Sequence, residues 1–174
     1  MRLLPNSKRS QQILGLSFGV IFSIILIIFF IVTAIMVIKS FLNTRDCSQE
    51  GMFVDRLKTN VQDTWNSGHT SQNFPGVLPS GIKYVCFMDL SRSPEGDYED
   101  IGYDLSIYDK RDPSRNSNTF FYPSKETCIK EKIIPHIDVD KITETDNPYC
   151  VPVRKGKVTL VIEKTSGSGL VTVS

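Results

Sequence analysis

Four cysteines are the residues of this 174-residue chain whose type and spacing could do the most chemistry. They are Cys47, Cys86, Cys128 and Cys150, separated by 39, 42 and 22 positions. No C-x-x-C pair occurs among them, so the signature of a zinc ribbon is missing and no metal site is predicted. An even number of cysteines in a small domain predicts two disulfide bonds instead, and four cysteines allow three pairings.

Of the three pairings we favour Cys47–Cys86 with Cys128–Cys150. The first bond would join a helix expected after Cys47 to the first expected strand, which contains Cys86. The second would close the irregular stretch between Cys128 and Cys150, where loop closure restricts the unfolded chain. Each unstrained bond would contribute about 2–4 kcal/mol to stability.

Histidines and acidic residues are the other side chains with catalytic potential. His69 lies in the polar segment "SGHTSQ" and His136 in the turn-like segment "PHID", and neither is near a nucleophile motif in the sequence. No G-x-S-x-G elbow, P-loop or G-x-G-x-x-G occurs. We therefore predict no catalytic residue and no cofactor, and we expect that the protein is not an enzyme.

The acidic run "SPEGDYEDIGYD" could offer several oxygen ligands to calcium, but it lacks the D-x-D-x-D-G spacing of an EF-hand. We interpret it as the solvated tip of a hairpin. Its carboxylates are Glu95, Asp97, Glu99, Asp100 and Asp104.

A long apolar run precedes all of these residues. From Ile13 to Ile38 there are 26 residues without a charge or a proline. At a rise of about 1.5 Å per residue, such a helix is about 39 Å long, against about 30 Å for the hydrocarbon core of a bilayer. The run is too long for the apolar part of a signal peptide, and its exit "AIMVIKSFLN" has no Ala-x-Ala site. We expect an uncleaved transmembrane helix over residues 13–38.

Flanking charges and cysteines both indicate the orientation of this helix. Arg2, Lys8 and Arg9 precede the run, whereas Lys39 and Arg45 follow it, and the positive-inside rule places the more basic side in the cytoplasm. All four cysteines follow the run, which suits an oxidising compartment. We predict a cytoplasmic segment over residues 1–12 and an extracytoplasmic domain over residues 39–174, in the cell membrane.

The extracytoplasmic part is expected to be an α+β domain. Phe53, Leu57, Val61 and Trp65 recur every fourth residue and predict an amphipathic helix, continuous with the first or separate from it, packed on an antiparallel sheet. Residues 67–81 contain many breakers and predict a loop. Strands are expected at 82–90, 103–109 and 118–122, with three more between 149 and 174, whereas 125–140 is ambiguous and could form a short helix ending before Pro135.

Net charge limits the partners of this domain. From Asp46 onward the chain has 15 basic and 19 acidic residues, a net charge of −4, since five of the 20 basic residues precede Asp46. Nucleic-acid binding calls for a basic surface, so no nucleic-acid partner is expected. Membrane lipid, other envelope proteins and further copies of the chain remain as partners.

Two resemblances follow from these residues. The run "SQQILGLSFGVIFSIILIIFFIVTAIMVIKSFL", the positions Cys47, Phe53, Leu57 and Trp65, and the segment "LPSGIKYVCFMDL" are similar to uncharacterised single-pass membrane proteins of small-genome archaea. The resemblance covers Lys8 to Leu90. It implies a membrane-anchored extracytoplasmic domain and brings no site residues.

The second resemblance is looser and concerns type IV pilin-like proteins. These have a basic N-terminus, a long apolar helix that continues as an amphipathic one, and a head with an antiparallel sheet. Arg9-Ser10-Gln11 stands where an archaeal prepilin peptidase would cut, although Ser10 replaces the usual Gly or Ala. Our leading expectation is a non-catalytic structural or protein-binding module of the envelope. The alternative is a pilin-like subunit that polymerises through its apolar helix.

Overall fold

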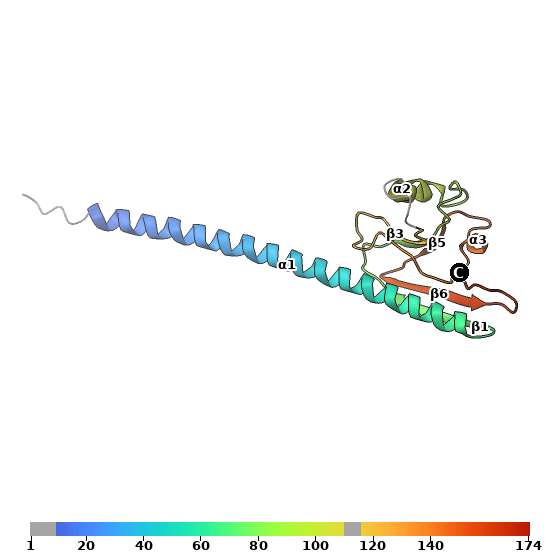
Figure 1. The fold of residues 1–174 in the computed structure, drawn as a ribbon. Coiled ribbons are helices and arrows are strands. Elements are labelled where there is room, and N and C mark those ends of the chain that lie inside the picture. Colours follow the sequence, from blue (N-terminus) through green and yellow to red (C-terminus); the bar gives the residue numbers. More distant parts are fainter. Residues whose placement is uncertain (1–9, 110–115) are drawn as a thin grey trace, which may run out of the picture. The chain divides into compact units, whose positions relative to one another are not determined.

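A computed structural model describes residues 10–109 and 116–174 of the chain, with side chains from Phe18 onward in the first helix and up to Ile107 in the second (Figure 1). The chain divides between Thr44 and Arg45 into two compact units. In its described residues the first unit contains helix only. The second has helices and antiparallel sheets, so the expected α+β class is confirmed.

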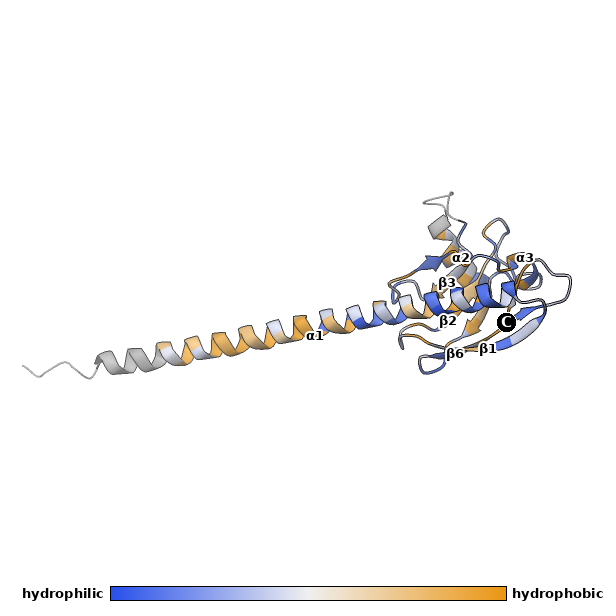
Figure 2. Ribbon diagram, turned by 60° about the horizontal axis from the view of Figure 1, so that its bottom comes forward, coloured by the Kyte–Doolittle hydropathy of each residue, from blue (hydrophilic) through white to orange (hydrophobic). Residues whose placement is uncertain are grey.

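Helix α1 runs from Ser10 to Asn66 and supplies residues to both units. Its apolar side chains in the first unit are exposed almost without exception, from Phe18 at 72% to Leu42 at 47%. Figure 2 shows this part of α1 as nearly continuously hydrophobic, whereas the part in the second unit alternates with polar residues. Within the described residues, α1 is the one helix long and apolar enough to cross a membrane.

Two antiparallel sheets form the second unit. One sheet has the strand order β1-β6-β7 and the other has β4-β3-β2-β5. The strands are β1 (Thr70–Val77), β2 (Tyr84–Phe87), β3 (Thr119–Tyr122), β4 (Glu131–Lys132), β5 (Tyr149–Pro152), β6 (Lys157–Lys164) and β7 (Thr172–Val173). Helices α2 (Glu99–Asp109) and α3 (Val139–Ile142) lie in the connections.

The apolar stripe of α1 enters the main core of this unit. Phe53, Leu57 and Val61 are at most 2% exposed, as the fourfold spacing predicts. The Phe53 ring contacts the Phe74 ring of β1 at 5.5 Å and the Phe121 ring of β3 at 5.8 Å, both edge-on. This helix therefore joins the two sheets through one aromatic residue.

Residues 67–81 do not form only a loop, and that prediction is wrong. Strand β1 pairs with β6 over eight residues, from Thr70 opposite Lys164 to Val77 opposite Lys157. Pro75 and Gly76, which indicate a loop in the sequence, are compatible with β1 because this strand lies at the edge of its sheet. A proline in an edge strand needs no hydrogen-bond partner for the N–H that it lacks. Gly76 is required there because a Cβ atom at this position would lie 2.2 Å from the Phe53 ring.

The strand expected at 103–109 is also wrong, because these residues belong to helix α2. Burial follows a helical and not an alternating pattern: Gly102 and Leu105 are buried, whereas Tyr103 and Asp104 are exposed. A Cβ atom at Gly102 would lie 2.6 Å from Pro94 and 2.7 Å from Pro148. The close approach to two prolines fixes the inward side of α2.

The remaining segments agree with the sequence in part. Strands β2, β3, β5, β6 and β7 lie where strands were expected. The ambiguous stretch 125–140 has no helix before Pro135; it contains β4 and the beginning of α3 instead. Asp138 caps α3 by accepting a hydrogen bond from the Lys141 N–H at 3.1 Å.

Candidate functional site

All four cysteines form disulfide bonds, as expected, but the favoured pairing is wrong. The bonds are Cys47–Cys128 and Cys86–Cys150. Strand β2 pairs with β5 in a register that sets Cys86 directly opposite Cys150, so this cross-strand bond forms within one sheet. The sequence shows neither which strands are neighbours nor their register. Cys47 is then left with Cys128, which joins α1 to the segment between β3 and β4.

A buried carboxylate lies beside the first disulfide. Glu50 is 0% exposed, and its Oε2 atom accepts hydrogen bonds from the N–H groups of Cys128 at 2.9 Å and Ile129 at 2.8 Å. Its Oε1 atom is buried and has no hydrogen-bond partner among the described residues. Burial raises the pKa of Glu50, the two backbone hydrogen bonds oppose that rise, and the nearby Asp46 adds to it.

Sequence reasoning missed this role of Glu50, since a glutamate one turn after a cysteine on a polar stretch carries no signal of burial. Its effect is to hold the Cys128 segment on α1. The bond and the carboxylate together fasten the beginning of the second unit's helix to the sheet that contains β3.

The two histidines have structural contacts. His69 Nδ1 lies 3.0 Å from the Lys164 carbonyl oxygen. The His136 ring stacks on Trp65, with ring centroids 3.8 Å apart and an angle of 13° between the planes. Trp65 is half-buried, and its Nε1–H donates to the Gly169 carbonyl oxygen at 2.9 Å. Across the described part of the chain, no group of three His, Cys, Asp or Glu residues converges to hold a metal ion.

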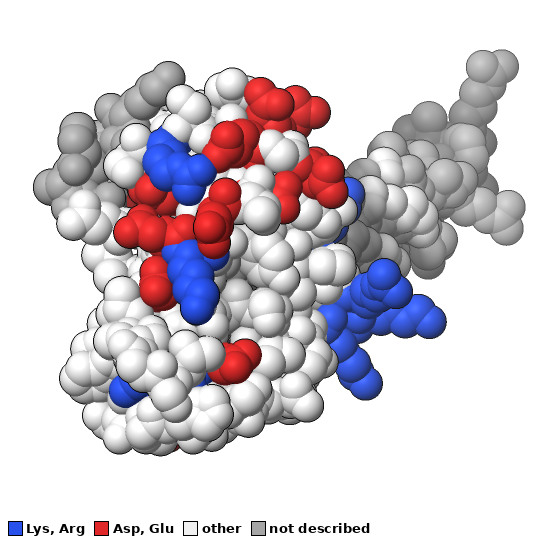
Figure 3. All heavy atoms as spheres, turned by 90° about the vertical axis from the view of Figure 1, so that its right-hand side faces the viewer, with Lys and Arg blue, Asp and Glu red and all other residues white. Residues whose placement is uncertain are grey.

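The acidic run is solvated, but it does not form the tip of a hairpin. Glu95 forms an isolated bridge with Asn147 and an ion pair with Arg92, and the Asp97 N–H donates to Asp146 Oδ1 at 3.1 Å. The remaining three carboxylates are carried by α2: Glu99, Asp100 and Asp104. Figure 3 shows Asp and Glu side chains gathered over the upper part of one face of the molecule.

Asn147 organises the loops around this acidic surface. Its side chain is 0% exposed, and the Nδ2 group donates to the carbonyl oxygens of Asp89, Arg92 and Ser93 at 3.0, 3.3 and 3.2 Å. Its Oδ1 atom accepts from the Asp89 N–H at 3.0 Å. One amide therefore satisfies four backbone groups of the loop after β2.

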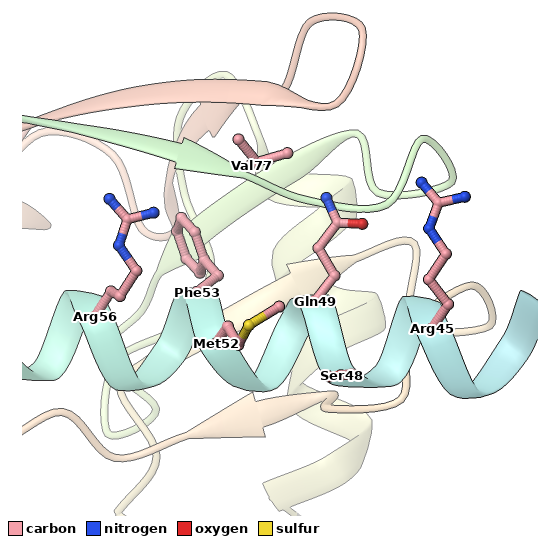
Figure 4. Close-up of a pocket in the computed structure, with 7 residues that line it drawn as sticks. All are labelled: Arg45, Ser48, Gln49, Met52, Phe53, Arg56 and Val77. Atoms are coloured by element: carbon pink, nitrogen blue, oxygen red, sulfur yellow. The ribbon is translucent and has the colours of Figure 1, made fainter.

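A groove of about 440 Å³ lies beside α1 in the second unit, with an apolar middle and charged groups at its rim (Figure 4). Met52 and Val77 are 58% and 52% exposed in it, and Phe53 forms its closed side. Arg45 and Arg56 lie at its two ends. The lining residues are Arg45, Ser48, Gln49, Met52, Phe53, Arg56 and Val77.

The two arginines of the groove share one side of α1. They are eleven positions apart, which is about three turns and about 16 Å along a helix. Figure 4 shows both side chains, with Gln49 between them, on the side of α1 where Val77 lies. Arg56 donates a long hydrogen bond of 3.4 Å to the Pro75 carbonyl oxygen, and its guanidinium carbon lies 5.5 Å from the centroid of the Phe74 ring. Within the described residues, neither arginine has an ion-pair partner.

Such a groove can bind a ligand that is apolar along its middle and negatively charged at both ends. Sequence reasoning counted Arg45 only among the charges that flank the apolar run, and it assigned Met52 and Arg56 no role in binding. Only the return of the chain in β1 places Val77 opposite them.

No protein-family model, curated protein or solved structure matches this chain.

Proposed function

We propose that this protein is a single-pass membrane anchor that displays a disulfide-braced, non-catalytic binding or structural module outside the cytoplasm. The observation that carries the proposal is the first part of α1. Its most apolar window has a mean hydropathy of 3.3 and is 0% buried within the protein. Apolar side chains exposed around a whole helix need a non-aqueous surrounding, and a bilayer supplies it.

The cysteines support the compartment. Both bonds lie after the apolar run, and the chain has no free cysteine. Disulfides of this kind persist in oxidising compartments and are rare in the cytosol. With the N-terminal basic residues inside, the second unit faces outward.

A binding role is supported by the kind of surface that the second unit offers. The groove along α1 is apolar with cationic ends, whereas both histidines are engaged by a backbone carbonyl oxygen and by Trp65. A surface of this kind suits recognition of another molecule better than proton transfer.

Single introduced cysteines test the topology, because the native chain has no free thiol to compete. Ser166→Cys places a thiol in the exposed turn between β6 and β7, and Ser7→Cys places one before the apolar run. We expect a membrane-impermeant maleimide to label Ser166→Cys on intact cells and Ser7→Cys only after lysis. The reverse pattern would overturn the orientation, and recovery of the protein in the soluble fraction would overturn the anchor.

The second candidate is a pilin-like filament subunit. It is favoured by α1, a single helix whose apolar part is followed by an amphipathic part with a buried stripe. The same apolar residues that suit lipid would then pack against other copies. Mass spectrometry of the mature N-terminus separates the two candidates: an intact Met1 or Arg2 contradicts processing, whereas a start at Ser10 or Gln11 contradicts the simple anchor.

A further inference from the structure

Helix α2 has an exposed surface that nothing in the described chain covers. Its inward side consists of Gly102, Leu105 and the half-buried Ile101. On the outward side Tyr103 and Ile107 lie one turn apart and are 53% and 51% exposed.

Three carboxylates surround this apolar pair. At about 100° per residue, Glu99 falls on one flank of Tyr103 and Ile107, and Asp100 and Asp104 fall on the other. All three are exposed, and Glu99 accepts a hydrogen bond from Tyr103 that raises the pKa of the tyrosine. We call these five residues the α2 surface.

The α2 surface and the groove along α1 have opposite chemistry. The groove has Met52 and Val77 exposed along its middle and at each end an arginine that forms no ion pair with any described residue. The α2 surface has an apolar middle and carboxylates at its edges. A helix laid in a groove through its apolar face is an established mode of recognition, and opposite charges at the rim set its orientation.

One copy cannot make this contact with itself. Figure 1 separates α2 from the last turns of α1, with the sheets between them. The contact must therefore join two molecules.

We propose that the groove of one copy receives helix α2 of a second copy. The proposal rests on the binding role proposed above and names the partner. A net charge of −4 on the part of the chain from Asp46 makes two copies repel in most orientations, so a pairing of the basic groove with the acidic helix is selective. Because the two surfaces differ, the contact is heterologous: each bound copy still offers a free groove or a free α2, and the assembly can extend.

Charge reversal tests this pairing in the full-length protein in detergent micelles. One variant carries Arg45→Glu and Arg56→Glu, and a second carries Glu99→Lys and Asp104→Lys. Each variant alone would set like charges against each other. Self-association is measured by sedimentation velocity and by cross-linking with distinguishable tags on the copies.

We expect the wild type to form oligomers and each variant alone to associate at least about ten-fold more weakly, a change of about 1.4 kcal/mol. Mixing the two variants should restore association as chains in which the variants alternate, because the groove of each variant then meets an α2 surface of opposite charge on the other. A chain with all four reversals should regain extended association. Restored association in the mixture separates a lost contact from a damaged fold, since a misfolded variant cannot be rescued by a second variant.

Matched controls change the net charge by the same amount as the variants but avoid both surfaces. Lys58→Glu with Lys83→Glu matches the groove variant, and Asp140→Lys with Glu144→Lys matches the α2 variant; all four residues are exposed. Both controls should associate as the wild type does. Equal weakening in the controls would assign the effect to overall charge and overturn the pairing.

Other outcomes also overturn it. Association that persists in both reversal variants would place the contact in the apolar part of α1. Loss of binding to phosphatidylglycerol vesicles in the groove variant, with self-association unchanged, would assign the groove to lipid. The topology labelling is independent of these results, so the binding partner and the membrane anchor can fail separately.

Discussion

Replacing Gly76 by alanine should destabilise the second unit through the aromatic contact that joins α1 to both sheets. The added Cβ atom would lie 2.2 and 2.7 Å from two atoms of the Phe53 ring and 3.0 Å from a Val158 methyl carbon. The ring cannot simply rotate away, because it is held edge-on by Phe74 and Phe121.

The expected cost follows from overpacking. Extra volume in a well-packed core costs about 1–3 kcal/mol of stability, and this cost falls where a shift of the backbone relieves the close contact. For a domain of this size the melting temperature should fall by about 3 °C for each kcal/mol. Shortening the ring should remove the conflict, so Gly76→Ala should cost at least about 1 kcal/mol less in a Phe53→Leu background, since residues in contact couple by about 0.5–3 kcal/mol.

Urea denaturation of the full chain in mild micelles measures this, followed by the fluorescence of Trp65. Trp65 is the only tryptophan and lies in the second unit, stacked on His136, so it reports that unit and not the apolar part of α1. Gly68→Ala is the matched control, because a Cβ atom there meets nothing within 4 Å. Wild-type stability of Gly76→Ala, or an equal cost with and without the full Phe53 ring, would refute the reasoning.

Three further predictions use the same assay. Burial raises the pKa of Glu50 above its ordinary value of 4.5, so the folded state binds this proton more tightly than the unfolded chain does. The contribution of Glu50 to the free energy of unfolding is therefore lost as pH rises from 4.5 through the raised pKa. Wild type should lose stability relative to Glu50→Gln above pH 4.5, and parallel pH profiles of the two proteins would contradict this. Asn147→Asp removes the donor to three carbonyl oxygens and should cost about 3 kcal/mol or more, whereas an unchanged urea midpoint would show that water replaces it. Replacing Cys47 and Cys128 by serine opens a bond across 81 positions and should cost about 2–5 kcal/mol, and a non-reducing peptide map of the wild type should link the same two cysteines.

Short-range patterns misled the sequence analysis at two elements. The segment from Tyr103 to Asp109 alternates like a strand, but it is a helix because Gly102 allows close packing against Pro94 and Pro148. The segment around Pro75 and Gly76 reads as a loop, but it is a strand because the long β6 supplies all of its pairing on one side. Both outcomes depend on neighbours that are distant in the sequence.

The sequence by itself determined the long apolar helix, the buried stripe that follows it, and the presence of two disulfide bonds, because helical periodicity and cysteine number are local or countable properties. Tertiary structure alone decided which cysteines meet. The register of β2 against β5 sets Cys86 opposite Cys150, and the fold of the segment after β3 brings Cys128 to Cys47. It also decided the groove, since Val77 reaches the arginine side of α1 only when β1 returns along the helix. Strand partners and registers are set by packing between distant segments, and no local pattern carries that information.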